Sequence, residues 1–158
     1  MSRTLVRLFY FKLQFDFSQN LFPRKFSLNL YKTICLNIHT RHKILFISSW
    51  FPNKLEPTNG NFVQRHAEAV SLLHDVEVLH AIGDFNQKEK FVFDDQVING
   101  IRTLIVYYKN SKNPLQNFLR RMKAYQLGFK KMQKPDLVHG NVLHNNMLFA
   151  VSLKRKYG

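Results

Sequence analysis

Residues 43–61 read KILFISSWFPNKLEPTNGN, and this stretch decides the predicted fold. It begins with an apolar run over 43–47, which predicts a strand over 43–48. It then passes through a loop that contains Pro52, Pro57 and Gly60 and leads into a helical pattern. A buried strand that enters a helix through such a loop is typical of α/β sheets. Open parallel sheets bind ligands beside the carboxyl ends of their strands, so this loop is a candidate ligand site. The start of the helix adds unpaired backbone N–H groups and a partial positive charge.

The first helix is predicted over about residues 62–73, and Asn59 or Asn61 can cap its start. Its expected buried stripe is formed by Phe62, His66, Val70 and Leu73, with Val63, Ala67 and Ala69 beside them. A strand is predicted over 76–82. Asn99-Gly100 then separates two β-type runs, 91–93 and 101–108, and such a pair is a strong hairpin signal.

A longer helix is predicted to begin at Pro114, with Asn113 as its cap, and to end before Pro135. Its apolar stripe consists of Leu115, Phe118, Leu119, Met122, Tyr125, Phe129 and Met132. A short strand over 137–139 and a helix over about 146–157 follow. This alternation predicts an α/β fold class: a Rossmann-like parallel sheet with helices on both faces, plus a β-hairpin.

The composition limits the class of protein. The chain has 158 residues, 45% of them hydrophobic, which is enough for one domain with a core. Its formal net charge of +14 favours an anionic partner, either nucleic acid, an acidic membrane or a phosphorylated ligand. The single cysteine, Cys35, excludes an internal disulfide framework and a cysteine-rich zinc site. No apolar run reaches the roughly 18 residues that span a bilayer.

Residues 1–42 differ in character from residues 43–158. They are basic, rich in Phe and Tyr, and contain no glycine, and apolar residues alternate with polar ones around Phe11, Leu13 and Phe15. One interpretation is a targeting or membrane-surface arm. The other is a poorly folded extension, or an incorrectly assigned start with the native start near Lys43. The predicted division is therefore an atypical extension over 1–42 and an incomplete Rossmann-like domain over 43–158.

Two blocks of the sequence resemble GT-B glycosyltransferases of family four, in particular the bacterial group that builds surface polysaccharides. The first block is KILFISSWFP at 43–52 with GNFVQRHAEA at 60–69, and the second is PDLVHG at 135–140. The resemblance covers about residues 43–158 and implies the amino-terminal, acceptor-side domain of such an enzyme. A parent enzyme of this hexosyltransferase type transfers a sugar from a nucleotide-sugar donor to a glycan or lipid-linked acceptor.

The resemblance also implies what this chain lacks. In the family, a carboxyl-terminal half binds the nucleotide sugar through a pair of glutamates, and this half has no counterpart here. The catalytic residues are accordingly expected beyond Gly158, and the chain alone is expected to be an inactive fragment. No metal and no cofactor is expected, because the nucleotide sugar is a substrate. The expected location is cytoplasmic, peripheral to the inner face of the membrane.

Six residues are candidates for the site. The resemblance implies that Gly60 and Asn61 form the donor-phosphate loop, although many family members carry a Gly-Gly pair where this chain has Gly60-Asn61. Arg65 in the following helix can pair with an anionic group or remain solvated. Three further residues at or beyond the end of the last strand can hydrogen-bond sugar hydroxyls in the acceptor cleft: His139, Asn141 and His144.

A rival function remains open at this point. The basic face of the helix that begins at Pro114 can meet acidic lipid headgroups or simply be solvated. The chain lacks the sequence patterns of common nucleic-acid-binding domains, so no nucleic-acid partner is expected. The alternative to a glycosyltransferase is a non-catalytic basic α/β module that binds nucleic acid or an acidic membrane.

Overall fold

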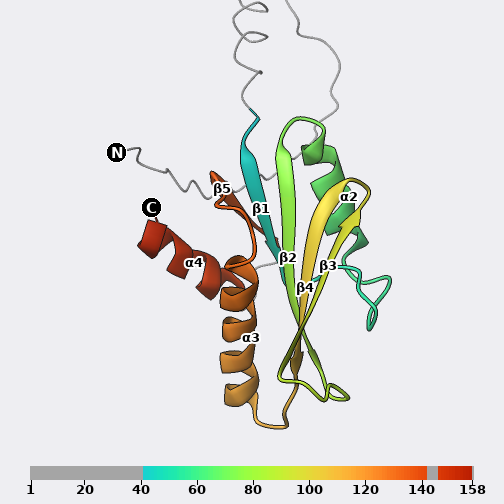
Figure 1. Cartoon of the computed structure of the whole chain (residues 1–158), viewed down its shortest axis with the longest axis vertical. Coiled ribbons are helices and arrows are strands. Elements are labelled where there is room, and N and C mark those ends of the chain that lie inside the picture. The colour runs from blue at the N-terminus through green and yellow to red at the C-terminus, as the bar shows by residue number, and fades with distance from the viewer. Residues whose placement is uncertain (1–40, 142–145, 158) are drawn as a thin grey trace, which may run out of the picture. The chain divides into compact units, whose positions relative to one another are not determined.

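A computed structural model describes residues 41–141 and 146–157. It confirms the predicted α/β class: five strands form one sheet in the order β3-β4-β2-β1-β5 (Figure 1). The strands are β1 (Lys43–Ser48), β2 (Asp75–Asp84), β3 (Phe91–Ile98), β4 (Ile101–Lys109) and β5 (Leu137–Asn141). β1, β2, β4 and β5 run parallel, whereas β3 is antiparallel to β4. The predictions for residues 1–40 and Gly158 lie outside the described residues.

Helices cover both faces of the sheet, as predicted. The helices of the described residues are α2 (Asn61–Ser71), α3 (Pro114–Phe129) and α4 (Asn146–Tyr157). Successive side chains of a strand point to opposite faces, so Leu45 and Ile47 of β1 pack with α3 and α4, and Phe46 packs under α2. Figure 1 shows α3 and α4 on one side of the sheet and α2 on the other.

The chain changes direction across the sheet on either side of β1. The β1–α2–β2 unit places β2 on one side of β1, and the connection from β4 through α3 returns the chain to β5 on the other side. β5 pairs with β1 in a register that sets Ser48 opposite Asn141. The carboxyl end of β1 therefore lies at the topological switch point, where open α/β sheets bind ligands.

The face of α2 that packs on the sheet differs from the predicted one. The buried residues are Val63 and Ala67, whereas Phe62 is 57% and Leu73 58% exposed. The bulky groups of this layer come from the sheet and the preceding loop, as Phe46 and Phe51, so the helix contributes small side chains. Val70 of the predicted stripe packs against this layer, as expected. Phe62, His66 and Leu73 of the same stripe are exposed, so the buried face is rotated by about one residue toward Val63 and Ala67.

The predicted asparagine cap of α2 was also wrong. Gly60 occupies the N-cap position, and no side chain caps the helix. The side-chain amide of Asn59 instead donates to the Glu56 carboxylate, and Asn61 is already the first residue of the helix.

The predicted start of α3 is confirmed, but its buried stripe is only partly so. Asn113 Oδ1 accepts hydrogen bonds from the backbone of Leu115 and Gln116, and Pro114 is the first helical residue. Leu115 and Leu119 of the predicted stripe are 66% and 58% exposed. The fully buried positions are Ala124, Tyr125 and Gly128, so only the carboxyl half of α3 packs closely on the sheet. A Cβ at Gly128 would lie 2.5 Å from Leu79 Cδ1, which shows how close that contact is.

The predicted hairpin is confirmed at Asn99-Gly100, where both residues have positive φ, 50° and 80°. β3 extends to Ile98, well past the predicted 91–93, because all eight residues pair with β4. The sequence prediction left the polar segment 94–98 unassigned, and an edge strand tolerates polar side chains. Arg102 of β4 joins this strand to β2 through ion pairs with Asp95 (2.8 Å) and Glu77 (3.0 Å).

Candidate functional site

The loop after β1 has an ordered set of side-chain hydrogen bonds. Ser48 Oγ accepts a hydrogen bond from the backbone N–H of Trp50 (3.1 Å) and donates to the Trp50 carbonyl. The buried Asn53 donates from Nδ2 to the Phe51 carbonyl (2.8 Å) and accepts at Oδ1 from the backbone N–H of Leu55 (2.9 Å). These contacts fix the loop over the α2 side of the sheet, where Phe51 is buried.

Gly60 has a structural reason to be glycine. Its φ is +76°, and a Cβ there would lie 2.6 Å from the carbonyl carbon and oxygen of Trp50. The Gly60 carbonyl accepts from the N–H groups of Val63 (2.9 Å) and Gln64 (3.3 Å). Within the described part of the chain, the N–H groups of Asn61 and Phe62 have no hydrogen-bond partner. The amides open to an anion are therefore those of Asn61 and Phe62, and the phosphate role of this loop stays a prediction.

A buried histidine and a buried tyrosine form hydrogen bonds with Ser48, the last residue of β1. The Ser48 carbonyl accepts from His80 Nδ1 (3.0 Å) on the α2 face and from Tyr125 Oη (2.9 Å) on the α3 face. Burial lowers the pKa of His80 to about 4, so the imidazole is neutral, and the contact assigns its proton to Nδ1. The sequence predicted Tyr125 as a buried residue of the α3 stripe but not its hydrogen bond to Ser48, and it did not single out His80. The available signal for His80 was one histidine inside the apolar strand 76–82.

His139 lies in an aromatic cluster on the α2 face of the sheet. Its ring stacks on Phe46 with centroids 4.7 Å apart, and His66 of α2 meets it edge-on at 5.1 Å. Burial, together with the nearby His66, lowers the pKa of His139, and a hydrogen bond with Asn141 opposes that shift. The structure thus brings together two of the predicted site residues, His139 and Asn141, and adds His66, which was expected to be a packed residue of the helix stripe.

Among the residues that the structure describes, no contact joins the other two predicted acceptor-cleft residues, Arg65 and His144, to this cluster. Arg65 is exposed, its charge acts on Glu68 three residues further on, and no described contact joins it to His139. His144 lies outside the described residues. Over residues 41–141 and 146–157, no group of three His, Cys, Asp or Glu side chains could hold a metal ion.

Two exposed aromatic side chains also lie at this end of the sheet. Trp50, in the loop, is 43% exposed, and Phe62, in the first turn of α2, is 57% exposed. Their rings meet edge-to-face with centroids 6.5 Å apart. Sequence reasoning missed this pair because Phe62 was assigned to the buried stripe.

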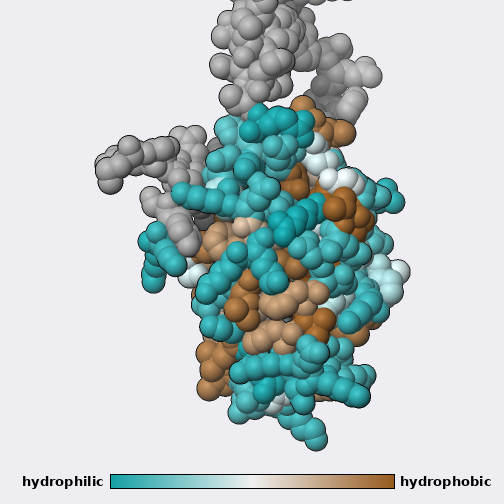
Figure 2. Space-filling model, viewed as in Figure 1, coloured by the Kyte–Doolittle hydropathy of each residue, from teal (hydrophilic) through white to brown (hydrophobic). Residues whose placement is uncertain are grey.

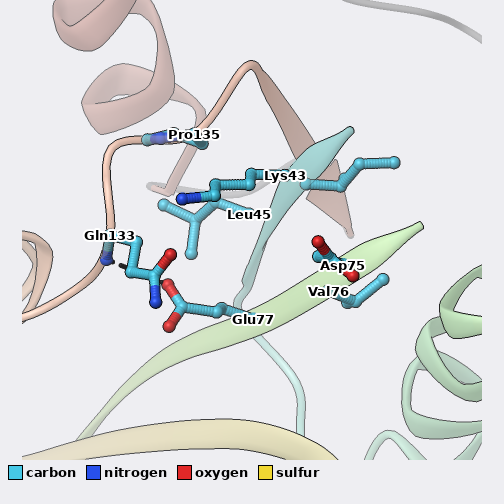
Figure 3. A pocket seen from close by; sticks show the side chains of 8 residues that line it. Lys43, Leu45, Asp75, Val76, Glu77, Gln133 and Pro135 are labelled. Carbon is cyan, nitrogen blue, oxygen red and sulfur yellow. Dashed lines mark hydrogen bonds between the residues drawn. The ribbon is translucent and has the colours of Figure 1, made fainter. Parts of the chain in front are cut away.

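A cavity of about 160 Å³ lies at the opposite, amino ends of β1 and β2 (Figure 3). Lys43, Asp75, Glu77 and Gln133 are among the residues that line it. Glu77 Oε2 accepts from the backbone N–H of Gln133 (3.0 Å), and its Oε1 accepts from Arg102. These contacts tie the segment after α3 to the sheet, which is a structural role. The cavity is distinct from the candidate site at the carboxyl end of β1.

Comparison with known proteins identified no relative of this chain. No protein-family model, no curated protein and no solved structure matches this chain. The fold and the geometry of the site are therefore the grounds for a functional proposal, together with the resemblance of the sequence blocks.

Proposed function

We propose that this chain is the acceptor-side half of a glycosyltransferase that uses a nucleotide sugar. One observation carries the proposal: His66, His139 and Asn141 lie beside the switch point, on the same side of the sheet as the uncapped start of α2. The resemblance of 43–52, 60–69 and 135–140 to GT-B enzymes supports the same assignment.

The proposed chemistry of this half is positioning. A neutral imidazole both donates and accepts hydrogen bonds, as sugar hydroxyls do, and the lowered pKa of His139 keeps it neutral near pH 7. The N–H groups of Asn61 and Phe62, at the positive end of the α2 dipole, would bind a donor phosphate oxygen. The residues that bind the rest of the nucleotide sugar and promote the transfer would belong to the second half that the resemblance implies, beyond Gly158.

The donor side of this proposal can be tested by NMR on the full chain. Titration with UDP-, GDP-, dTDP- and ADP-linked hexoses should shift the backbone amide signals of Asn61 and Phe62 with one of the four. The start of α3 is an internal control, because Asn113 already occupies the amides of Leu115 and Gln116. Equal shifts at both helix starts would indicate non-specific anion binding, and no shift with any donor would contradict the phosphate role.

A peripheral membrane location is a second proposal, supported by α3. Leu115 and Leu119 are exposed one turn apart, and Lys112 and Lys123 are exposed near them. Figure 2 shows hydrophobic side chains over α3 interrupted by hydrophilic ones. Such a surface can place apolar groups at the lipid boundary and cations among acidic headgroups. No helix among the described residues is long and apolar enough to span a membrane.

Vesicle sedimentation tests the membrane proposal against its rival. Replacing Leu115 and Leu119 with Ser should weaken binding to phosphatidylglycerol vesicles, whereas Val97→Ser, at a position on the hairpin that is at least as exposed, should not. Binding to DNA with a steep salt dependence, and none to vesicles, would favour the nucleic-acid module instead.

A further inference from the structure

The exposed Trp50 ring is carried by a backbone that is fixed on two sides. The Ser48 side chain bonds both the N–H and the carbonyl of Trp50, and Gly60 abuts the same carbonyl so closely that no Cβ would fit. A large aromatic ring on a fixed backbone loses little conformational entropy when it binds a ligand. The position combines apolar area, exposure and preorganisation, which are properties of a binding surface.

The aromatic surface continues from Trp50 along α2 to β5. Phe62 meets Trp50, and His66 follows Phe62 by four residues, which places it on the same face about 6 Å further along the helix. His66 in turn contacts His139. We call these four residues, Trp50, Phe62, His66 and His139, the aromatic row.

The chemistry of the aromatic row matches a neutral sugar. A pyranose ring has C–H bonds on its faces, which pack on aromatic rings, and hydroxyls around its edge, which need hydrogen-bond partners. The row offers both: Trp50 and Phe62 at one end, and two imidazoles with the neighbouring Asn141 at the other. The four side chains of the row include no lysine or arginine, so the side chains themselves offer no cation to a phosphate, in contrast to the backbone N–H groups at the start of α2. A purely apolar ligand would not use the imidazoles.

We infer that the aromatic row binds a neutral sugar unit of the acceptor, with the ring on Trp50 and Phe62 and the hydroxyls toward His66 and His139. The inference rests on the proposed function and makes it more specific: the part of the acceptor recognised by this half is a glycan, whether or not a lipid carries it.

Trp50 is the only tryptophan of the chain, so its fluorescence reports on the aromatic row alone. The full chain is titrated at neutral pH with maltotetraose, cellotetraose, mannotetraose and chitotetraose. One of these should give a saturable change in Trp50 emission. Phe62→Ala should weaken that binding about fivefold to tenfold, as expected for loss of an aromatic contact. Phe85→Ala is the matched control, because Phe85 is 69% exposed outside the aromatic row.

Two further variants separate binding from folding. Trp50→Phe keeps an aromatic ring and should retain weakened binding by calorimetry, and His139→Asn should also weaken binding. Circular dichroism of each variant must match the parent, so that a loss of affinity is not a loss of fold. Equal effects of Phe62→Ala and Phe85→Ala would overturn the inference.

The two proposals fail in different ways. If nucleotide sugars shift the Asn61 and Phe62 amides but no glycan changes Trp50 emission, the inference is wrong and the proposed function stands. If a glycan binds at the aromatic row and no nucleotide sugar binds, the inference stands for a carbohydrate-binding module, and the donor side of the proposed function is lost. A change of Trp50 emission with phosphatidylglycerol vesicles, and with no glycan, would assign this surface to the membrane and overturn the inference.

Discussion

Acidification is expected to destabilise this fold through His80, whose side chain is only 1% exposed. Burial lowers the pKa of His80 from 6.5 to about 4, and its hydrogen bond to the Ser48 carbonyl offsets only part of that effect. In the unfolded chain the imidazole binds its proton near pH 6.5, whereas in the folded chain it stays neutral down to about pH 4. The unfolded state therefore holds more protons in this window, and the free energy of unfolding decreases as the pH falls through it.

The size of this effect follows from the difference in pKa. A shift of one pH unit within the window changes the free energy of unfolding by about 1.4 kcal/mol per group. His80 alone should then contribute a loss of about 2 kcal/mol between pH 7 and 5, and about 3 kcal/mol by pH 4. That is a large fraction of the 5 to 15 kcal/mol that is roughly typical of a folded domain. The pKa of His139 is also lowered, so this residue adds a loss of the same sign.

Urea unfolding at pH 7 and pH 5, followed by Trp50 fluorescence and circular dichroism, measures this loss. His80→Asn retains a side-chain N–H near the position of Nδ1 but removes the titrating group, so its stability should depend much less on pH. His42→Asn, at an exposed histidine, should behave like the parent. The relevant quantity is the difference between the two pH values, because the substitution itself also changes packing. A variant His80→Asn that loses as much stability as the parent would refute the reasoning.

Three further substitutions test the contacts around the site, each by urea unfolding. Gly60→Ala should destabilise the fold by at least about 2 kcal/mol, because it combines a positive φ with a clash against Trp50. The control Gly100→Ala has a similar φ but open space around it, and it should cost about 1 kcal/mol. Equal losses of stability in the two variants would contradict the close contact at Gly60. Tyr125→Phe should cost about 1 to 2 kcal/mol, because it removes the buried hydrogen bond to the Ser48 carbonyl, and a neutral result would mean that this bond contributes nothing. Asn113→Ala should cost about 1 kcal/mol through loss of the α3 cap, and Asn113→Ser should restore most of it.

Local sequence signals predicted the ends of several elements correctly. The strand over 43–48, the Asn113-Pro114 start of α3, the Asn99-Gly100 turn and the helix over 146–157 all lie where the sequence placed them. Each depends on short-range chemistry: a cap, a proline at the first helical position, or a pair of residues that adopt positive φ. The fold class followed from the order of these elements.

The buried face of a helix depends on its partner, and the sequence of the helix alone does not define it. Phe62 and Val63 of α2 are equally compatible with an apolar stripe, but Phe46 and Phe51 already fill the space under the helix, so the smaller residue faces inward. The same limit applies to α3, where close packing occurs at Gly128 and leaves Leu115 exposed. Because the sequence assigned Phe62 to the buried face of α2, the exposure of this side chain was not predicted.

The candidate site could be predicted in part, because parallel pairing fixes where strand ends lie. His139 and Asn141 were expected at the rim from their place after an apolar run, and the pairing of β5 with β1 puts them beside the end of β1. The contact of His139 with His66 required knowledge of how α2 is rotated, and the bond between His80 and Ser48 required the register of β2 against β1. These are tertiary relationships with no local signature.

Within residues 41–141 and 146–157, the exposure of the aromatic row follows from the topology. The chain leaves β1 toward the α2 face, but α4, which follows β5, packs on the opposite face with Leu45, Val138 and Tyr125. Among the described residues, no helix other than α2 covers the α2 face next to β5. His139 is therefore held by Phe46 from one side and by His66 at its edge, and it remains half-buried. A ligand bound on the aromatic row, as inferred above, would cover these side chains.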